Sequence, residues 1–153
     1  MQAVEIINFS EDLAEHIKRL NYAWIEKYFR LEAGDIQSLS NPQTEIVDKG
    51  GLIYYARIGQ EIVGTVSLLK KSDSVFELAK MAVSEGYQGY KIGTKLMDHC
   101  LAVAKELKLQ KLILYSNRRL LPALHLYQKY GFVEVELEKG LYDRADIKME
   151  MLL

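Results

Sequence analysis

Two periodicities divide the chain into short segments. Alternating or continuous apolar positions predict strands at residues 3–9, 52–58, 61–70, 75–83, 111–116, 132–137 and 145–152. Helical spacing predicts one or two amphipathic helices from Ser10 to about Phe29, a long helix after Lys91, and another between Pro122 and Gly131. The intervening stretch 31–51 looks irregular, with room for a short helix after Pro42. No linker or repeat interrupts this order, so we expect one domain over 1–153, an α/β or α+β sheet with helices on both faces.

Composition narrows the class of protein. Lys plus Arg (20) nearly balance Asp plus Glu (21), so the sequence offers no global basic field for nucleic acid. Cys100 is the one cysteine, which excludes an internal disulfide and fits a reducing compartment. No apolar run approaches the roughly 20 residues that span a bilayer, and no signal peptide is visible. We therefore expect a soluble, cytoplasmic protein with no membrane partner.

The segment from Ala79 to Met97 has the pattern of a phosphate-binding turn. An apolar strand is followed by a glycine-bearing turn and a helix start with two lysines, Lys91 and Lys95. Free amides and the dipole at a helix start favour a di- or triphosphate ester. The spacing fits neither the hydrolase P-loop nor the dinucleotide fingerprint, which disfavours a nucleotide-binding protein. What remains is Gln-x-x-x-x-Gly from Gln88 to Gly93, a weak signal that an ordinary strand-to-helix connection also explains.

A second constellation lies further along the chain. Asn117 follows a predicted strand, and Ala-x-x-Leu-Tyr-x-x-x-Gly-Phe runs from Ala123 to Phe132 on a predicted helix. Together with Met-Ala-Val at 81–83 and the turn at 88–93, these motifs resemble those of the GNAT superfamily of N-acetyltransferases. Their order and spacing match over roughly the last half of the chain.

The resemblance implies a mostly antiparallel, twisted sheet of about six to seven strands with a splayed parallel pair ending near Val83 and Asn117. Acetyl-CoA, a co-substrate, is expected in the gap between those two strands. The cofactor-binding residues that the resemblance implies are Met81, Ala82, Val83, Gln88, Gly89, Tyr90, Lys91, Ile92, Gly93, Thr94, Asn117 and Ala123. For Asn117, a turn residue at a strand end is the alternative.

Two residues are candidates for the chemistry. Tyr127 looks like the family's general acid, because a phenol stays protonated at neutral pH and can protonate a departing thiolate; a packed helical tyrosine is the alternative. Glu77 is the candidate base. It precedes Met81 by four residues in one predicted strand, so period two places both on one face, pointing toward the reacting carbonyl. An exposed strand glutamate, with water as the proton relay, is equally open. No metal-site spacing is present.

Lys91 departs from the family pattern, because it stands where Gln-x-x-Gly-x-Gly expects its first glycine. Either the lysine is forced into a left-handed backbone conformation, or the turn is helical here and the lysine directs its charge at the phosphates. We favour the second explanation, since Lys95 lies one turn later on the same predicted helix face.

Of all the features of the proposed reaction, the sequence says least about the acceptor substrate. Residues that the resemblance places on the acceptor side include Trp24, Tyr28 and Tyr142, which suit a small-molecule or peptide amine but could also cover the core. The sequence leaves a homodimer open. The leading hypothesis is an acetyl-CoA-dependent N-acetyltransferase that uses direct transfer in a ternary complex. The alternative is a CoA-binding sensor or interaction module that has lost turnover.

Overall fold

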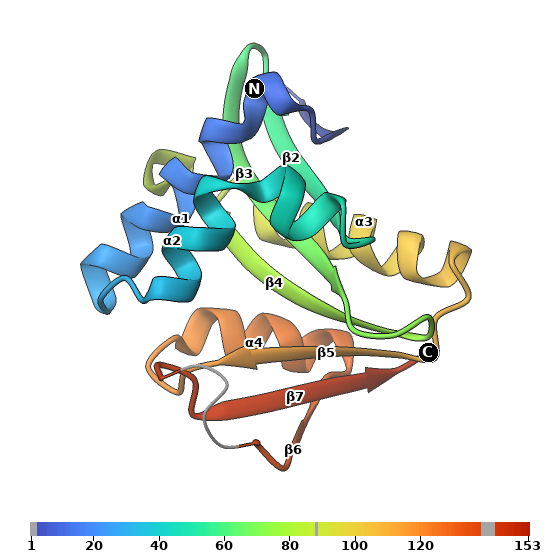
Figure 1. Cartoon of the computed structure of the whole chain (residues 1–153). Helices are drawn as coiled ribbons and strands as arrows, with labels where there is room; N and C mark the ends of the chain where they lie inside the picture. The colour runs from blue at the N-terminus through green and yellow to red at the C-terminus, as the bar shows by residue number, and fades with distance from the viewer. Residues whose placement is uncertain (1–2, 88, 139–142) are drawn as a thin grey trace.

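The structure is a computed structural model that describes residues 3–87, 89–138 and 143–153. Its strands are β1 (Val4–Asn8), β2 (Leu52–Ile58), β3 (Glu61–Lys70), β4 (Val75–Val83), β5 (Lys111–Ser116), β6 (Val133–Val135) and β7 (Ile147–Leu152). Its α-helices are α1 (Ala14–Tyr28), α2 (Ala33–Ser40), α3 (Ile92–Glu106) and α4 (Leu121–Tyr130) (Figure 1). Short helical turns occupy Glu11–Leu13, Gln43–Val47 and Glu85–Tyr87. None of the helices in the described ranges is long and apolar enough to cross a membrane.

The strands form one sheet in the order β1-β2-β3-β4-β5-β7-β6. Among the described strands, β4 and β5 make the one parallel pair, and every other pair is antiparallel. The expected fold class is therefore confirmed. The prediction of an irregular stretch at 31–51 was wrong, because α2 lies within it, and the strands expected at 132–137 and 145–152 are shorter than predicted.

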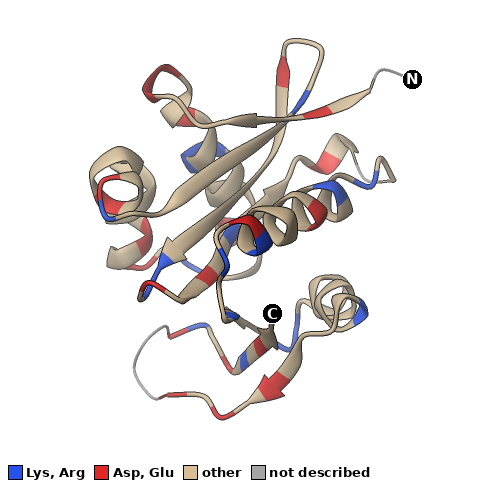
Figure 2. Cartoon of the chain, turned by 90° about the vertical axis from the view of Figure 1, so that its right-hand side faces the viewer, with Lys and Arg blue, Asp and Glu red and all other residues tan. Residues whose placement is uncertain are grey.

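Helices cover both faces of the sheet, as expected. One buried cluster joins the sheet to α1 and α2 through Ile17, Ile25 and Leu39. The other joins the opposite face to α3 and α4 through residues such as Leu96 and Leu124. Figure 1 shows α1 and α2 on one side of the central strands and α3 on the other. Figure 2 shows basic and acidic residues interspersed along the chain, in keeping with the near balance of charge.

The parallel pair separates after a short stretch of pairing. Val75–Glu77 pair with Lys111–Ile113, although β4 continues to Val83 and β5 to Ser116. Beyond Glu77 the two strands diverge, which is visible in Figure 1 as the widening space between β4 and β5. The carboxyl-terminal halves of both strands are thus unpaired along the edges that face each other.

An extra residue in β4 accompanies this separation. Ser67 pairs with Ala79 and Thr65 with Ala82, so two steps along β3 oppose three along β4, the count of a β-bulge. Lys80 lies at the bulge with a left-handed φ of 56°. A bulge turns the strand, which explains why the parallel pairing with β5 does not continue.

The bulge overturns one sequence-based expectation. Phe76 and Leu78 belong to the cluster under α3 and α4, and Met81 packs against that same cluster. Because side chains alternate along a strand, Glu77 points to the opposite face, toward α1 and α2. The prediction that Glu77 and Met81 share a face was wrong, since it assumed an unbroken period of two across Lys80.

Gly64 sets how closely α3 approaches the sheet. A Cβ on Gly64 would lie 2.8 Å from Cγ2 of Ile92, the first residue of α3, and 3.3 Å from a Leu96 methyl group. Because Gly64 has no side chain, α3 can begin this close to β3.

We predict that Gly64→Ala lowers the free energy of unfolding by about 1–3 kcal/mol, the range for overpacking a core. Thermal unfolding measures the change. Gly86→Ala is the matched control, because a Cβ there meets nothing within 4 Å. Equal melting temperatures for the two variants would show that the Gly64 contact does not position α3.

Candidate functional site

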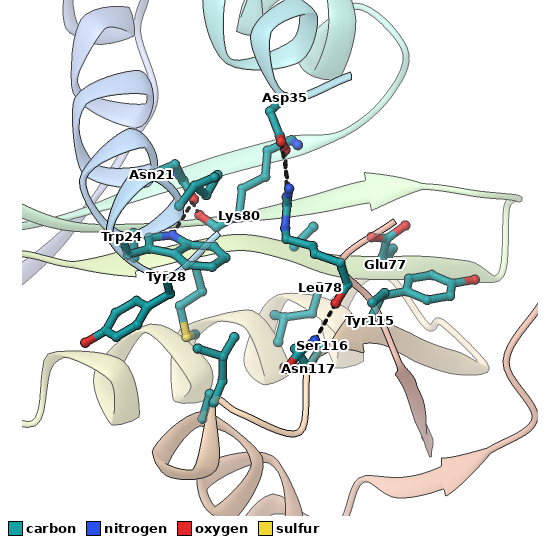
Figure 3. Close-up of a pocket in the computed structure, with 18 of the residues that line it drawn as sticks. Asn21, Trp24, Tyr28, Asp35, Glu77, Leu78, Lys80, Tyr115, Ser116 and Asn117 are labelled. Atoms are coloured by element: carbon teal, nitrogen blue, oxygen red, sulfur yellow. Dashed lines mark hydrogen bonds and ion pairs between the residues drawn. The ribbon is translucent and has the colours of Figure 1, made fainter. Parts of the chain in front are cut away.

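A cavity of about 290 Å³ opens where β4 and β5 separate (Figure 3). The separating strands line it with Glu77–Val83 from β4 and with Tyr115, Ser116 and Asn117 at the end of β5. Ala123 and Tyr127 line it from α4. The structure therefore brings Met81, Ala82, Val83, Asn117, Ala123 and Tyr127 together around one space, although three separate segments supply them.

The part of β4 that lines this cavity lies beyond the residues that pair with β5. The Ser84 amide donates to the Val63 carbonyl in β3 at 2.8 Å. Amides of successive strand residues point to alternate sides, so the Val83 amide points away from β3. On that side β4 no longer pairs with β5. An extended amide-bearing ligand can add to this edge in the manner of a strand.

Tyr127 presents a phenol in an apolar setting. Its ring packs edge-on against Phe132, with centroids 6.1 Å apart, while the side chain is half-buried and lines the cavity. Burial raises the pKa of Tyr127 to about 12. The phenol is therefore protonated throughout the neutral range and can donate, but not accept, a proton there.

Asn117 uses both ends of its side-chain amide inside the protein. The Nδ2 group donates to the Arg144 carbonyl at 2.6 Å, and Oδ1 accepts from the Arg119 amide at 2.9 Å. The residue thus organises the turn after β5 and holds the chain that leads into β7, while it also lines the cavity.

The start of α3 lies outside the cavity lining but is joined to it through α4. The Tyr130 hydroxyl donates to the Thr94 carbonyl at 3.2 Å and also contacts the Asp98 carboxylate. The Lys95 amide is bonded to the Lys91 carbonyl at 3.1 Å, so the amides of Ile92, Gly93 and Thr94 precede the first intrahelical bond. These three amides therefore have no intrahelical acceptor, whereas the Tyr90 amide donates to the Tyr87 carbonyl at 3.3 Å. A phosphate cradle formed by this turn and Gly89 stays a prediction, and Gln88 lies outside the described residues.

Lys91 does not have the backbone conformation that we favoured. It caps α3 with φ 58° and ψ 33°, in the left-handed region, rather than continuing a helical turn. This conformation is the one that a glycine adopts without a penalty, which accounts for the family's glycine at the position. The helical explanation was therefore wrong, and Lys91 carries a backbone strain of about 1–2 kcal/mol.

Glu77 lines the cavity from the buried face of β4. Its side chain is only 2% exposed, and one carboxylate oxygen lies 3.1 Å from Nζ of Lys71. The alternative of an exposed strand glutamate is excluded by this burial.

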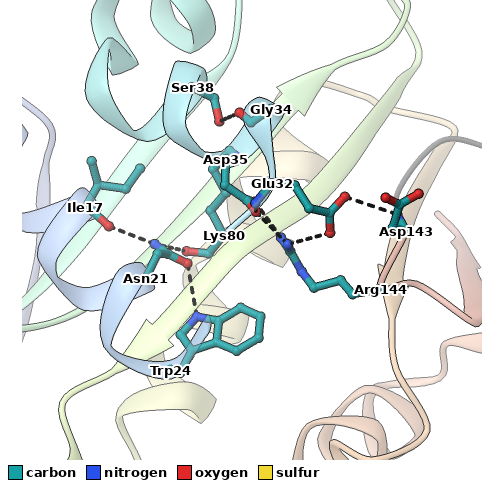
Figure 4. Close-up of polar contacts among 10 residues, drawn as sticks. All are labelled: Ile17, Asn21, Trp24, Glu32, Gly34, Asp35, Ser38, Lys80, Asp143 and Arg144. Atoms are coloured by element: carbon teal, nitrogen blue, oxygen red, sulfur yellow. Dashed lines mark hydrogen bonds and ion pairs between the residues drawn. The ribbon is translucent and has the colours of Figure 1, made fainter. Parts of the chain in front are cut away.

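The far side of the cavity is formed by α1 and α2. Trp24 and Tyr28 line it, which keeps open their predicted place on the acceptor side, whereas Tyr142 lies outside the described residues. The Arg144 guanidinium donates to both Asp35 oxygens at 2.6 Å each, and to Glu32 at 3.1 Å (Figure 4). Burial alone would raise the pKa of Asp35, but hydrogen bonds from Arg144 and from the Glu32 amide hold that pKa below its usual range.

Several lining residues went unnoticed in the sequence. Asp35 could have been found as the partner of Glu32 in a capping pair at the start of α2, and Lys80 as a charge inside an apolar strand. Asn21, which is buried in α1, carried no such signal. No group of three or more His, Cys, Asp or Glu side chains with metal-binding geometry occurs within the described parts of the chain.

Comparison with known proteins agrees with this geometry. The sequence profile of the "Acetyltransferase (GNAT) family" matches residues 11–132, so the chain belongs to the GNAT acetyltransferase family. A search of curated proteins finds no match.

Solved structures share the fold. A GNAT-family acetyltransferase from Staphylococcus aureus Mu50 superposes with a TM-score of 0.88 at 24% identity, covering 98% of this chain and 99% of that one. An acetyltransferase from Streptococcus agalactiae 2603 gives 0.86 at 20% identity over the full length of both chains, 100% each. The PaiA N-acetyltransferase from Thermoplasma acidophilum, solved in complex with coenzyme A, gives 0.76 at 21% identity, with 99% of each chain covered.

We predict that Lys91→Gly raises the free energy of unfolding by about 1 kcal/mol, because glycine relieves the left-handed strain. The melting temperature without ligand should rise by roughly 2–4 °C. Lys108→Gly is the matched control, since Lys108 is an exposed lysine with φ 57° at the other end of α3. A Lys91→Gly protein that melts at or below the parent temperature, while Lys108→Gly melts higher, would contradict the strain at Lys91.

Proposed function

We propose that this protein transfers the acetyl group of acetyl-CoA to a primary amine, by direct transfer within a ternary complex. The observation that carries the proposal is the gap between β4 and β5, which places an unpaired strand edge and a protonated phenol around one cavity. The start of α3 lies outside that lining and is joined to it through the contact of Tyr130 in α4 with Thr94. The acetyltransferase family supplies the donor class.

The donor binds through two backbone features. The outward amides and carbonyls near Met81 and Val83 pair with the pantetheine arm, and the first-turn amides of α3 hold the pyrophosphate. Both features use main-chain groups, so a lysine in place of a glycine at position 91 is compatible with the proposed site. Gly93 keeps the approach to the helix start free of a larger side chain, and a Cβ there would come no nearer than 3.5 Å to Leu126.

Proton transfer falls to Tyr127 and Glu77. The acceptor amine must lose a proton before its nitrogen can form a bond to the thioester carbon, and Glu77 accepts that proton directly or through a water molecule. When the carbon–sulfur bond breaks, the thiolate leaves with the electron pair and Tyr127 donates its phenolic proton to the sulfur. The two groups enter the cavity from different sides, β4 and α4, which suits an acid and a base acting in opposite directions.

The acceptor enters from the side of α1 and α2. Trp24 and Tyr28 offer aromatic surface there, and the Arg144 guanidinium carbon lies 5.7 Å from the centroid of the Trp24 ring. This wall suits a small-molecule amine or the end of a peptide.

We predict that Tyr127→Phe lowers kcat by about 10²- to 10⁴-fold, the range for a lost general acid, with little change in acetyl-CoA affinity. Thiol release across a panel of amines measures the rate, and calorimetry measures the affinity. Tyr22→Phe removes a phenol from α1 that does not line the cavity and should behave like the parent. If chemistry limits the rate and Tyr127→Phe turns over at parental speed, Tyr127 only packs the helix.

Glu77→Gln should depress the rate at neutral pH and recover part of it at high pH. The reason is that the acceptor amine then loses its proton to solvent without help from the protein. A pH–rate profile of kcat/KM from neutral to alkaline pH tests this outcome. Because Glu77 is paired with Lys71, Lys71→Met is the companion variant that separates loss of the base from loss of the ion pair. A Glu77→Gln profile parallel to that of the parent would leave water or another group as the proton acceptor.

A further inference from the structure

Lys80 lies between two cavities. It lines the cavity between β4 and β5, and it also lines a second cavity of about 350 Å³ beside α2. Asp35 is shared by the two cavities as well. Figure 4 shows the Lys80 side chain extending from β4 toward Asp35, next to the Arg144 side chain. The Lys80 amine thus lies near Asp35, on the side of the cavity that we propose for the acceptor.

The backbone at Lys80 gives no reason for a lysine. Its φ of 56° is left-handed, a conformation that a glycine adopts more easily, and its strain is about 1–2 kcal/mol. The Asn21 side chain donates to the Lys80 carbonyl at 3.1 Å and to the Ile17 carbonyl at 2.9 Å, which fixes the bulge through the main chain alone. A strained residue whose side chain enters a cavity points to a use for that side chain.

Charge balance distinguishes Lys80 from its neighbours. The other cations that line the two cavities have ion pairs: Arg144 with Asp35 and Glu32, Lys71 with Glu77, Lys70 with Asp73, and Lys49 with Glu45. Lys80 has no carboxylate within 4.0 Å among the residues that the structure describes. Burial lowers the pKa of Lys80, while the charges of Asp35 and Glu77 act in the opposite direction.

The two nearby carboxylates are already engaged. Both oxygens of Asp35 accept from Arg144, and one of them also accepts from the Glu32 amide at 2.9 Å. Glu77 is paired with Lys71 at 3.1 Å. To pair closely with Lys80, Asp35 would have to give up a hydrogen bond from Arg144, and Glu77 its ion pair with Lys71. A ligand can supply the close counter-charge for Lys80 without breaking either pair.

We propose that Lys80 binds a carboxylate of the acceptor, so that the acceptor is an amino acid or a related compound that carries both an amine and a carboxylate. This inference rests on the proposed function, because it names the class of amine that the same cavity accepts. The base candidate Glu77 lies three residues before Lys80 in β4. A zwitterionic acceptor can therefore place its ammonium toward Glu77 and its carboxylate toward Lys80.

The same surroundings disfavour a phosphate. A phosphate usually gathers several donors, whereas Lys80 offers one ammonium group. Asp35 and Glu77 also lie close enough to act on the charge of Lys80, and they would repel a dianion more than a carboxylate. The apolar and aromatic wall of Trp24, Tyr28 and Leu39 suits an aliphatic or aromatic side chain on the acceptor.

The test uses sets of three matched acceptors: an L-amino acid, its amide, and the amine that lacks the carboxyl group. The aliphatic and aromatic L-amino acids supply the sets, with phenylalanine, phenylalaninamide and 2-phenylethylamine as one example. We expect the parent to prefer the carboxylate-bearing member. In Lys80→Met, kcat/KM for that member should fall by about 10- to 100-fold, mainly through KM, the range for losing a hydrogen bond to a charged group. The amide and the simple amine should change by less than about threefold.

Two further variants complete the test. Lys80→Arg keeps the positive charge and should retain part of the preference, whereas Lys105→Met removes an exposed lysine of α3 and should match the parent. Melting temperature and CoA affinity show that each variant is folded with an intact donor site. Because an amide also alters the basicity of the amine, the readout is the change in the acid-to-amide ratio between parent and variant.

The outcomes separate this inference from the proposed function. Equal losses for all three acceptors in Lys80→Met, or complete inactivity of Lys80→Arg with every amine, would overturn carboxylate binding and give Lys80 a general role in the reaction. CoA binding without turnover of any carboxylate-bearing acceptor, or a parent that prefers amines without one, would also overturn it. Failure to bind acetyl-CoA would instead contradict the proposed function itself.

Discussion

The extra residue in β4 is the constraint on which the site depends. Ala79 and Ala82 oppose Ser67 and Thr65, and Lys80 takes up the surplus in a left-handed conformation. Up to Glu77, β4 pairs with β5 in parallel, and beyond it the two strands separate. A continuous sheet would satisfy its own backbone groups and leave no room for an extended ligand. The separated strands create both the cavity and an edge of unpaired amides, and the buried Asn21 fixes this geometry from α1.

The bulge also determines which side chains meet. Without it, Glu77 and Met81 would share a face, and the side chains of β4 would not divide between the helix layers as they do. With it, Met81 packs toward α3 and α4, while Glu77 and Lys80 lie on the face of α1 and α2. The side of the gap toward α3 and α4, where we propose that the donor binds, is therefore mostly main chain and apolar, and the side toward α1 and α2, proposed for the acceptor, carries the charges. Arg144 joins that side to the chain that precedes β7 through its pairing with Asp35.

Much of the fold could be predicted from the sequence, and the reasons for the failures are physical. The strands from β2 to β5 were found within their observed bounds, because apolar runs and glycine turns mark them clearly. Gly131, with φ 103°, ends α4 as expected. The short helix α2 was missed because its sequence, Ala-Gly-Asp-Ile-Gln-Ser-Leu-Ser, has a weak apolar face and a cap made by Glu32 and Asp35. The bulge was missed because a lysine in the sequence does not indicate a left-handed backbone conformation. The Asp35–Arg144 pair was missed because its two residues are 109 positions apart.

The central claim is that CoA occupies the gap between β4 and β5 and contacts the start of α3 at the same time. Backbone amide NMR of the protein with and without CoA tests it most directly. We expect CoA to shift the amides of Met81 and Val83 and those of Gly93 and Thr94 together, with slower hydrogen exchange at Val83 as its amide gains a partner. Perturbations confined to the second cavity beside α2, with the amides of β4 and α3 unchanged, would contradict the account.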